Sequence, residues 1–170
     1  MTGPVGDLLD PVARGDLRGW PGLPGGLTLA ELTSAYPADS DWAGSAQLGR
    51  RHRQASYRWV RFPGQQVLCR AWSDGEQVIL LDLADPPVTA GPAELAGLVG
   101  EPGTALDTWQ GTLPMPESEL VFPCHGLAVF VNRDTGAAWH LALFSPTTLP
   151  GYEDDLRIDL RTRRHQQRSG

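Results

Sequence analysis

Residues 67–83 read VLCRAWSDGEQVILLDL, and this stretch decides which fold the chain can adopt. Its centre, residues 73–76, contains the Asp-Gly pair that favours a tight β-hairpin turn. After the turn, the apolar residues Ile79, Leu81 and Leu83 recur at every second position, which is the period of a strand with one apolar face. We therefore predict an antiparallel hairpin with strands over 67–72 and 77–83.

Upstream of this hairpin, the sequence predicts one more strand and one short helix. Residues 57–62 form a strand-like run that ends at Pro63-Gly64. Before it, Thr28 and Glu31 have the spacing of a capping box, and Pro37 ends the helix that they begin. The first half is therefore a helix followed by antiparallel strands.

The same order of elements recurs in the second half. A helix is predicted from about residue 91 to a stop at 100–103, followed by strands over 119–122, 126–132 and 137–144. A further helix is predicted over 148–156. The halves align at offsets of 60 to 67 residues, which change only across loops. The matches are Glu31-Leu32 with Glu94-Leu95, Pro37 with Pro102, Trp42-Ala43-Gly44-Ser45 with Trp109-Gln110-Gly111-Thr112, turn 73–76 with turn 133–136, and Ile79, Leu81, Leu83 and Pro86 with Trp139, Leu141, Leu143 and Pro146.

We predict an α+β fold in which two diverged helix-plus-antiparallel-hairpin repeats form one sheet with short helices on one face. Within one globular domain, the predicted parts are an N-terminal lead-in over 1–26, repeat 1 over 27–90, repeat 2 over 91–157 and a basic, mobile tail over 158–170. Helices on one side would leave the opposite sheet face open. An exposed sheet face with large side chains is a common binding surface.

Short features at corresponding places in the two halves carry a family resemblance. They are Gly26, Glu31, Leu32 and Pro37 in the first half, Gly91 or Pro92, Glu94, Leu95, Gly100 and Pro102 in the second, and Asp74-Gly75 in the first hairpin. In tandem, these features resemble the β-lactamase-inhibitor-protein-like fold, and a single unit looks like the small outer-membrane assembly lipoproteins of the SmpA/OmlA type. The chain departs from both, because it lacks the lipoprotein's secretion signal and lipidation cysteine and the paired cysteines of secreted inhibitors. The resemblance implies a binding module whose open sheet face meets a protein partner.

Composition excludes several classes of function. The chain has 170 residues, enough for one domain with its own core, and a net charge of −6, which disfavours nucleic acid as a partner. All fourteen basic residues are arginine, which indicates a GC-rich bacterial source and excludes every mechanism that needs a lysine, including Schiff-base enzymes and P-loop nucleotide hydrolases.

Targeting and cofactor motifs are missing from the sequence. It has neither a signal peptide nor a membrane-spanning run, so we expect a cytoplasmic protein. No metal-binding or dinucleotide motif is present, and we predict no cofactor and no metal.

Five residues are predicted to share the open sheet face. Arg70 and Trp72 have the same parity in one strand, and His140 in the strand over 137–144 faces the side opposite its apolar neighbours. Asp82 lies in the corresponding strand of the first half, and Trp59 is free to serve as an interface anchor. Our first hypothesis is therefore a non-catalytic protein-interaction module, of the inhibitor, immunity or accessory kind, that binds through Trp59, Arg70, Trp72, Asp82 and His140.

A second hypothesis keeps chemistry open. A cofactor-independent enzyme or small-molecule-binding protein would use His140 or His125 with Asp82 or Asp134 in a sheet-face pocket. His125 follows Cys124, but neighbouring residues on a strand point to opposite faces, so we expect a packed thiol beside a surface histidine. Cys69 and Cys124 are predicted to be buried free thiols, although the sequence does not exclude a disulfide. The arginine clusters at 50–53 and 161–168 are predicted to be solvated, with nucleic-acid binding the lowest-ranked function.

Overall fold

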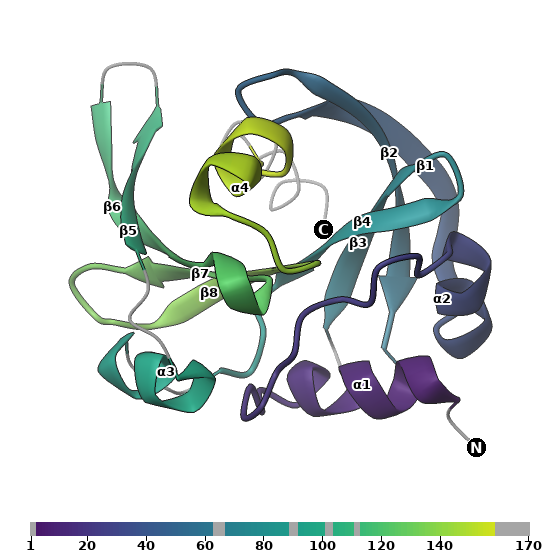
Figure 1. Ribbon diagram of the computed structural model, residues 1–170, viewed down its shortest axis with the longest axis horizontal. Coiled ribbons are helices and arrows are strands. Elements are labelled where there is room, and N and C mark those ends of the chain that lie inside the picture. The colour runs from purple at the N-terminus through teal and green to yellow at the C-terminus, as the bar shows by residue number, and fades with distance from the viewer. Residues whose placement is uncertain (1–2, 63–66, 89–91, 101–103, 111–112, 159–170) are drawn as a thin grey trace.

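The structure is a computed structural model that describes residues 3–62, 67–88, 92–100, 104–110 and 113–158 (Figure 1). These residues form one antiparallel sheet of eight strands in the order β1-β2-β3-β4-β8-β7-β6-β5. The strands are β1 (Ala38–Leu48), β2 (Arg53–Arg61), β3 (Leu68–Asp74), β4 (Gln77–Ala84), β5 (Thr104–Gln110), β6 (Leu113–Phe122), β7 (Leu127–Asn132) and β8 (Ala138–Phe144). The helices are α1 (Pro4–Ala13), α2 (Leu29–Ala35), α3 (Pro92–Val99), α4 (Leu149–Asp155) and the 3-10 helix η1 (Pro123–His125).

The hairpin predicted from residues 67–83 is confirmed. Strands β3 and β4 pair antiparallel, and Gly75 in their turn has a φ of +58°, a value that glycine adopts without steric cost. The capping box at the start of α2 is also confirmed, because the Thr28 side chain accepts from the Glu31 backbone N–H and the Glu31 carboxylate accepts from the Thr28 backbone N–H. The local sequence thus determines both the central turn and the start of α2.

One face of the sheet carries the larger apolar core, beneath α1, α2 and α3 (Figure 1). Leu81 and Leu83 of β4 and Leu141 and Leu143 of β8 point into this core together with Leu32 of α2. The predicted lead-in contributes as well. Its buried side chains in this core are Leu9, Val12, Ala13, Leu17, Trp20 and Leu23. Most of residues 1–26 therefore serve as a structural layer of the domain.

The two halves meet at the centre of the sheet, where β4 pairs with β8. From either edge, four consecutive strands run inward to this junction. The register pairs Leu80 with Phe144, Asp82 with Ala142 and Ala84 with His140. Asp82 and Ala142 are 60 residues apart, so the pairing is symmetric about these two residues when the halves are aligned at that offset. The α+β class is confirmed, and this palindromic order is what two repeats would produce. Descent of the halves from one repeated unit stays a prediction.

A fourth helix lies on the opposite face. Figure 1 shows α4 in the hollow of the curved sheet, between the β5–β6 hairpin and strands β1 and β2. Tyr152, Leu156 and Ile158 join a second buried cluster there with Trp72, Phe130 and other sheet residues. The Tyr152 ring stacks on Phe144 with a centroid distance of 4.8 Å. The expectation that this face is open is therefore wrong over its centre.

Several elements were not anticipated by the sequence pattern. Strands β1 and β5 form the two edges of the sheet and lie outside every predicted strand. Trp42 and Trp109 lie in these strands, and nothing is described of their side chains. The predicted tail lies almost wholly outside the described residues. Among the described residues, no helix has the length and apolarity that crossing a membrane requires.

Candidate functional site

The polar residues predicted to share a face do come together, as a buried charged cluster. Arg70 and Asp82 are direct cross-strand neighbours on β3 and β4. The Arg70 guanidinium donates to Asp82 Oδ2 from Nη2 at 2.6 Å and from Nε at 3.1 Å. His140 Nε2 contacts the other carboxylate oxygen, Oδ1, diagonally across β4 and β8. Both oxygens of Asp82 are therefore engaged by neighbouring side chains.

Three aromatic rings surround the Arg70 guanidinium. The Arg70 Cζ atom lies 4.8 Å from the ring centroid of Trp72, 5.3 Å from that of Tyr57 and 5.7 Å from that of Trp59. Such distances permit cation–π attraction, which is stronger where water is excluded. The predicted interface residues Trp59 and Trp72 thus hold an internal cation in place.

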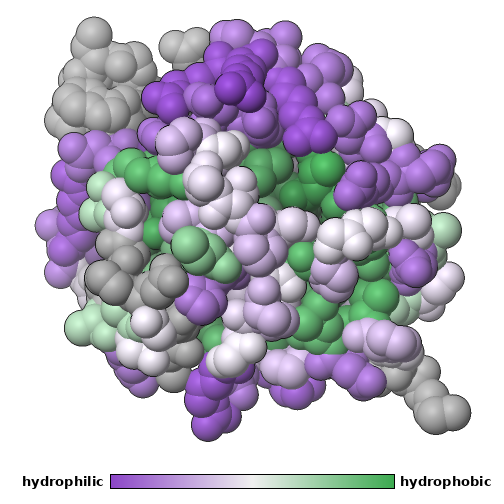
Figure 2. All heavy atoms as spheres, in the orientation of Figure 1, coloured by the Kyte–Doolittle hydropathy of each residue, from purple (hydrophilic) through white to green (hydrophobic). Residues whose placement is uncertain are grey.

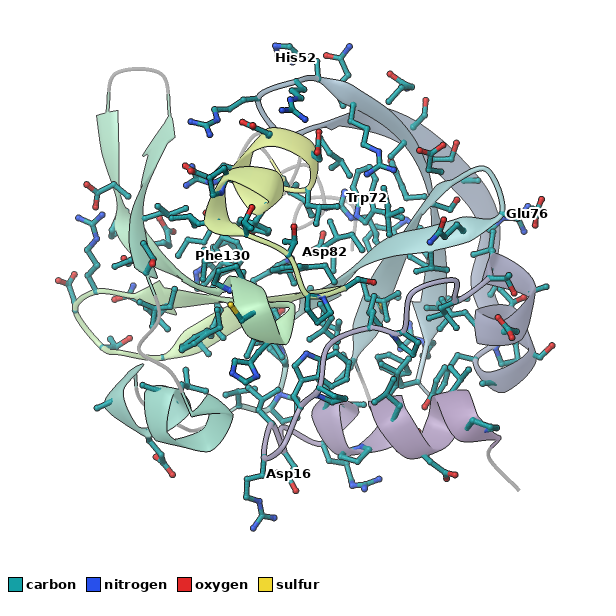
Figure 3. The ribbon with its side chains drawn as sticks, viewed as in Figure 1. Asp16, His52, Trp72, Glu76, Asp82 and Phe130 are labelled. Carbon is teal, nitrogen blue, oxygen red and sulfur yellow. The ribbon has the colours of Figure 1, made fainter. Side chains whose placement is uncertain are left out.

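Burial sets the limits of what this cluster can do. Arg70 is 1% exposed, Asp82 and His140 are each 2% exposed, and Trp72 is fully buried, whereas Trp59 is half-buried. Figure 3 shows Trp72 and Asp82 close to α4, toward the middle of the sheet. Four of the five predicted contact residues therefore present no surface to a partner, because aromatic side chains surround Arg70 and His140 and the cluster that includes Tyr152 of α4 encloses Trp72.

A second polar cluster fixes α4 to the second half of the sheet. The Tyr152 hydroxyl donates to Glu119 Oε1, and Arg157 Nε donates to Glu119 Oε2 at 2.7 Å. Arg157 Nη2 also donates to the Asp107 carbonyl at 3.1 Å. Glu119 is 1% exposed, and its charge is balanced by the half-buried Arg157, two residues beyond the end of α4, while the buried Tyr152 of the helix donates a hydrogen bond to it.

The β1–β2 turn holds α4 from the other side. The backbone N–H groups of Gly49, Arg50 and Arg51 donate to the carbonyls of Arg157, Glu153 and Asp154. The Arg50 and Arg51 side chains also pair with the acidic side chains of α4. The purple region at the top of Figure 2 covers this turn and the helix, with hydrophobic patches below it. The arginines at 50 and 51 are thus solvent-exposed, as predicted, but they bind α4.

Two buried indoles on the α4 side of the sheet lack hydrogen-bond acceptors. Trp72 Nε1 and Trp139 Nε1 are buried and have no partner among the described residues. Trp139 lies at a bulge where the β7–β8 register shifts, and its ring packs 5.4 Å from the His140 ring. The expectation that Trp139 shares the face of Leu141 and Leu143 is therefore wrong, because the bulge turns it toward Phe130 and His140.

A groove of about 450 Å³ lies at the β1 edge of the sheet, away from the buried cluster. We call it the β1 groove. Its lining residues are Leu29, residues 43–45, residues 56–58, Ser73 and Gly75. Among them, Ser45, Ser56 and Ser73 form one cross-strand row over β1, β2 and β3, and Arg58 lies two residues from Ser56 on the same face. The groove combines three serine hydroxyls and one guanidinium.

The three serine hydroxyls and the Arg58 guanidinium of the β1 groove are uncommitted. Within the described part of the chain, Arg58 makes no ion pair or hydrogen bond, and none of the three serine hydroxyls forms a hydrogen bond. Ser73 is nevertheless only 4% exposed. Sequence reasoning missed this site, because serines spaced along different strands leave no motif and β1 has none of the usual strand signals.

The remaining predicted residues lie apart from both sites. His125 ends η1 and is half-buried, and Asp134 is exposed in the β7–β8 turn.

The two cysteines differ in burial. Both cysteines are free, but Cys124 is exposed, which corrects the expectation that it is buried. Burial raises the pKa of the Cys69 thiol, with a smaller contribution from the charge of Asp82. The described residues contain no group of three or more histidine, cysteine or acidic side chains that could hold a metal.

Comparisons with known proteins give no further identification. No family model, curated protein or solved structure matches the chain. The resemblance to the β-lactamase-inhibitor-protein-like and SmpA/OmlA-type folds therefore stays a prediction, and the functional argument depends on the chain's own geometry.

Proposed function

We propose that this chain is a non-catalytic protein-interaction module, of the inhibitor, immunity or accessory kind. One observation carries the proposal: the side chains best suited to acid–base chemistry are buried and engaged with one another, while uncommitted polar groups gather beside a sheet edge. Asp82 contacts both Arg70 and His140, so a substrate would have to break a buried ion pair to reach it. Binding without chemistry needs only the exposed surface.

The binding surface in this proposal differs from the open face first expected. Arg70, Trp72, Asp82 and His140 form the buried support of the sheet, and we assign contact with the partner to the β1 edge. A sheet edge offers unpaired backbone N–H and C=O groups, which bind an extended chain by adding a strand. We place the protein in the cytoplasm, and the two free thiols support that placement.

The β1 groove also favours a second candidate, a small-molecule-binding protein. Its volume of about 450 Å³ lies in the range of ligand pockets, roughly 300–1,000 Å³. The guanidinium of Arg58 would select an anionic ligand. This candidate ranks below the first, because the sheet edge beside the groove offers backbone N–H and C=O groups that suit an extended peptide rather than a small molecule.

Affinity capture with the full chain separates the two candidates. The tagged protein is incubated with lysate of its source organism, and the eluate is examined both by protein mass spectrometry and by native mass spectrometry for small ligands. A heat-unfolded sample of the same chain serves as the control. We expect one protein retained in near-equimolar amount by the folded chain alone. Retention of a small molecule without any such protein would overturn the proposal in favour of the second candidate.

A further inference from the structure

Strand β1 forms one edge of the sheet, and its second half carries no charge. It pairs only with β2 within the described part of the chain, and residues 43–48, with the sequence AGSAQL, carry neither charge nor proline. Natural sheets commonly protect edges with charges, prolines or bulges to prevent unwanted pairing. The opposite edge, β5, has Asp107 at its centre, paired with Arg133 at 2.5 Å. Strand β1 likewise has Asp39 near its start, paired with Arg61 at 2.6 Å, and a register shift between Ala38 and Ala43. Its uncharged residues 43–48 are therefore the stretch suited to a further strand.

The groove beside β1 supplies the specificity that a bare edge lacks. The Ser45, Ser56 and Ser73 row and the Arg58 guanidinium can all donate hydrogen bonds toward a ligand. Ser73 as a residue is only 4% exposed, and its hydroxyl has no partner among the described residues, so it has a hydrogen bond to offer a ligand. Donors around an unpaired guanidinium are complementary to a carboxylate.

We propose that the β1 groove binds an extended acidic segment of a protein partner, which pairs with β1 as an added strand and places a carboxylate against Arg58. This inference rests on the proposed function and specifies the chemistry of its partner. A second copy of the chain fits poorly, because residues 43–48 carry no acidic side chain to meet Arg58. The chain's own residues 161–168 are arginine-rich and also fail to complement it.

The other side of the β1 edge predicts the alternation of the bound segment. The Tyr57 ring lies against Gly44, so close that a Cβ at position 44 would be 2.6 Å from its Cζ and hydroxyl oxygen. This places an aromatic surface at the edge, on the face opposite the serine row. Because successive side chains of a strand point to opposite faces, the segment should alternate acidic residues over Arg58 with apolar residues over Tyr57.

Peptide binding to the full chain tests this inference. The probes are paired short peptides that alternate valine with either glutamate or glutamine, and binding is measured by fluorescence anisotropy and by hydrogen–deuterium exchange. We expect the glutamate peptides to bind more tightly and to protect the amides of residues 43–48. Arg58→Gln should weaken glutamate-peptide binding by about tenfold or more, and Ser73→Ala by about threefold.

Two controls separate binding from folding. Arg14→Gln removes another exposed arginine that has no ion pair among the described residues and should leave affinity unchanged. Ser73→Ala should leave thermal stability unchanged or raise it, because the hydroxyl has no partner to lose. Equal binding of the glutamate and glutamine peptides, no binding of either, or protection away from β1 would each overturn the inference.

The outcome for the proposed function is separable. Ser45→Glu places a carboxylate in the groove. If lysate capture retains a partner equally with wild type and with Ser45→Glu, the chain is still a protein-interaction module, but the β1 groove is not its binding site. If Ser45→Glu and Arg58→Gln both abolish retention while Arg14→Gln does not, the site is supported. A dimer in sedimentation that Ser45→Glu dissociates would show that a second copy occupies the edge, and would overturn the acidic-partner inference.

Discussion

Arg70 and Asp82 face each other across β3 and β4 with Nη2 and Oδ2 2.6 Å apart, and their side chains are 2% and 0% exposed. Removing two opposite charges from water is costly, and the pair offsets that cost only through close geometry and further contacts. Here those contacts are His140 on the carboxylate and three aromatic rings around the guanidinium. The pair also lies beside the β4–β8 junction, where the two halves of the sheet meet.

Breaking this pair should destabilise the whole domain. Asp82→Asn leaves Arg70 as a buried charge without its counter-ion, and we expect the free energy of unfolding to fall by about 3 kcal/mol, measured by urea denaturation. The control is Arg53→Gln, which breaks an exposed ion pair with Asp74 and should change stability by less than about 1 kcal/mol. Equal losses in the two variants would show that burial does not govern the Arg70–Asp82 pair.

Strand parity predicted the members of this cluster correctly. Arg70 and Trp72 alternate with Cys69 and Ala71, and that period of two placed them on one face before any contact was known. Their meeting with His140 required the β4–β8 register, which joins residues 58 positions apart. No local pattern encodes such a pairing, because it is set by how the two halves pack.

The cover over the cluster was not predictable in the same way. A helix over 148–156 was expected, but its seven residues as observed carry too short a stripe to say which face it covers. Its position depends on Glu119 and on the turn at Gly49, both distant in sequence. The edge strand β1 was missed because it is rich in alanine, glycine and aspartate, which are depleted in strands.

The two cysteines should differ sharply in reactivity. Cys69 is fully buried and burial raises the pKa of its thiol, whereas Cys124 is exposed in η1. We expect one thiol per chain to react rapidly with Ellman's reagent in buffer and the second only after unfolding. Cys124→Ser should remove the rapid phase, and Cys69→Ser should retain it. Rapid reaction of both thiols in the native protein would contradict the burial of Cys69.

Tyr36 should make stability fall at alkaline pH. Its hydroxyl donates to Asp10 Oδ1, and burial, followed by the Asp10 hydrogen bond and charge, raises the pKa of Tyr36 well above the ordinary value of 10.0. The unfolded chain releases this proton above about pH 10 while the folded chain keeps it, so stability is retained below that pH and lost above it.

The comparison of wild type with Tyr36→Phe isolates this effect, because Cys69 and all other groups are common to both. The slope of unfolding free energy against pH should be shallower in Tyr36→Phe above pH 10, by up to about 1.4 kcal/mol per pH unit. Parallel slopes in urea titrations from about pH 9 to 11 would contradict the raised pKa.

The attachment of α4 to the β1–β2 turn depends on a glycine. Gly49 has a φ of +65°, and a Cβ at this position would lie 2.1 Å from the Asp154 carbonyl oxygen. Gly75 has a similar φ of +58°, but a Cβ there would have nothing within 4 Å. Both alanine substitutions carry the backbone cost of a positive φ, about 1 kcal/mol, and only Gly49→Ala also pushes α4 away. We therefore expect Gly49→Ala to cost about 1–3 kcal/mol more than Gly75→Ala and to increase hydrogen exchange selectively in residues 149–155. If the two variants unfold at the same urea concentration and α4 stays protected in both, the turn does not hold the helix over the charged cluster.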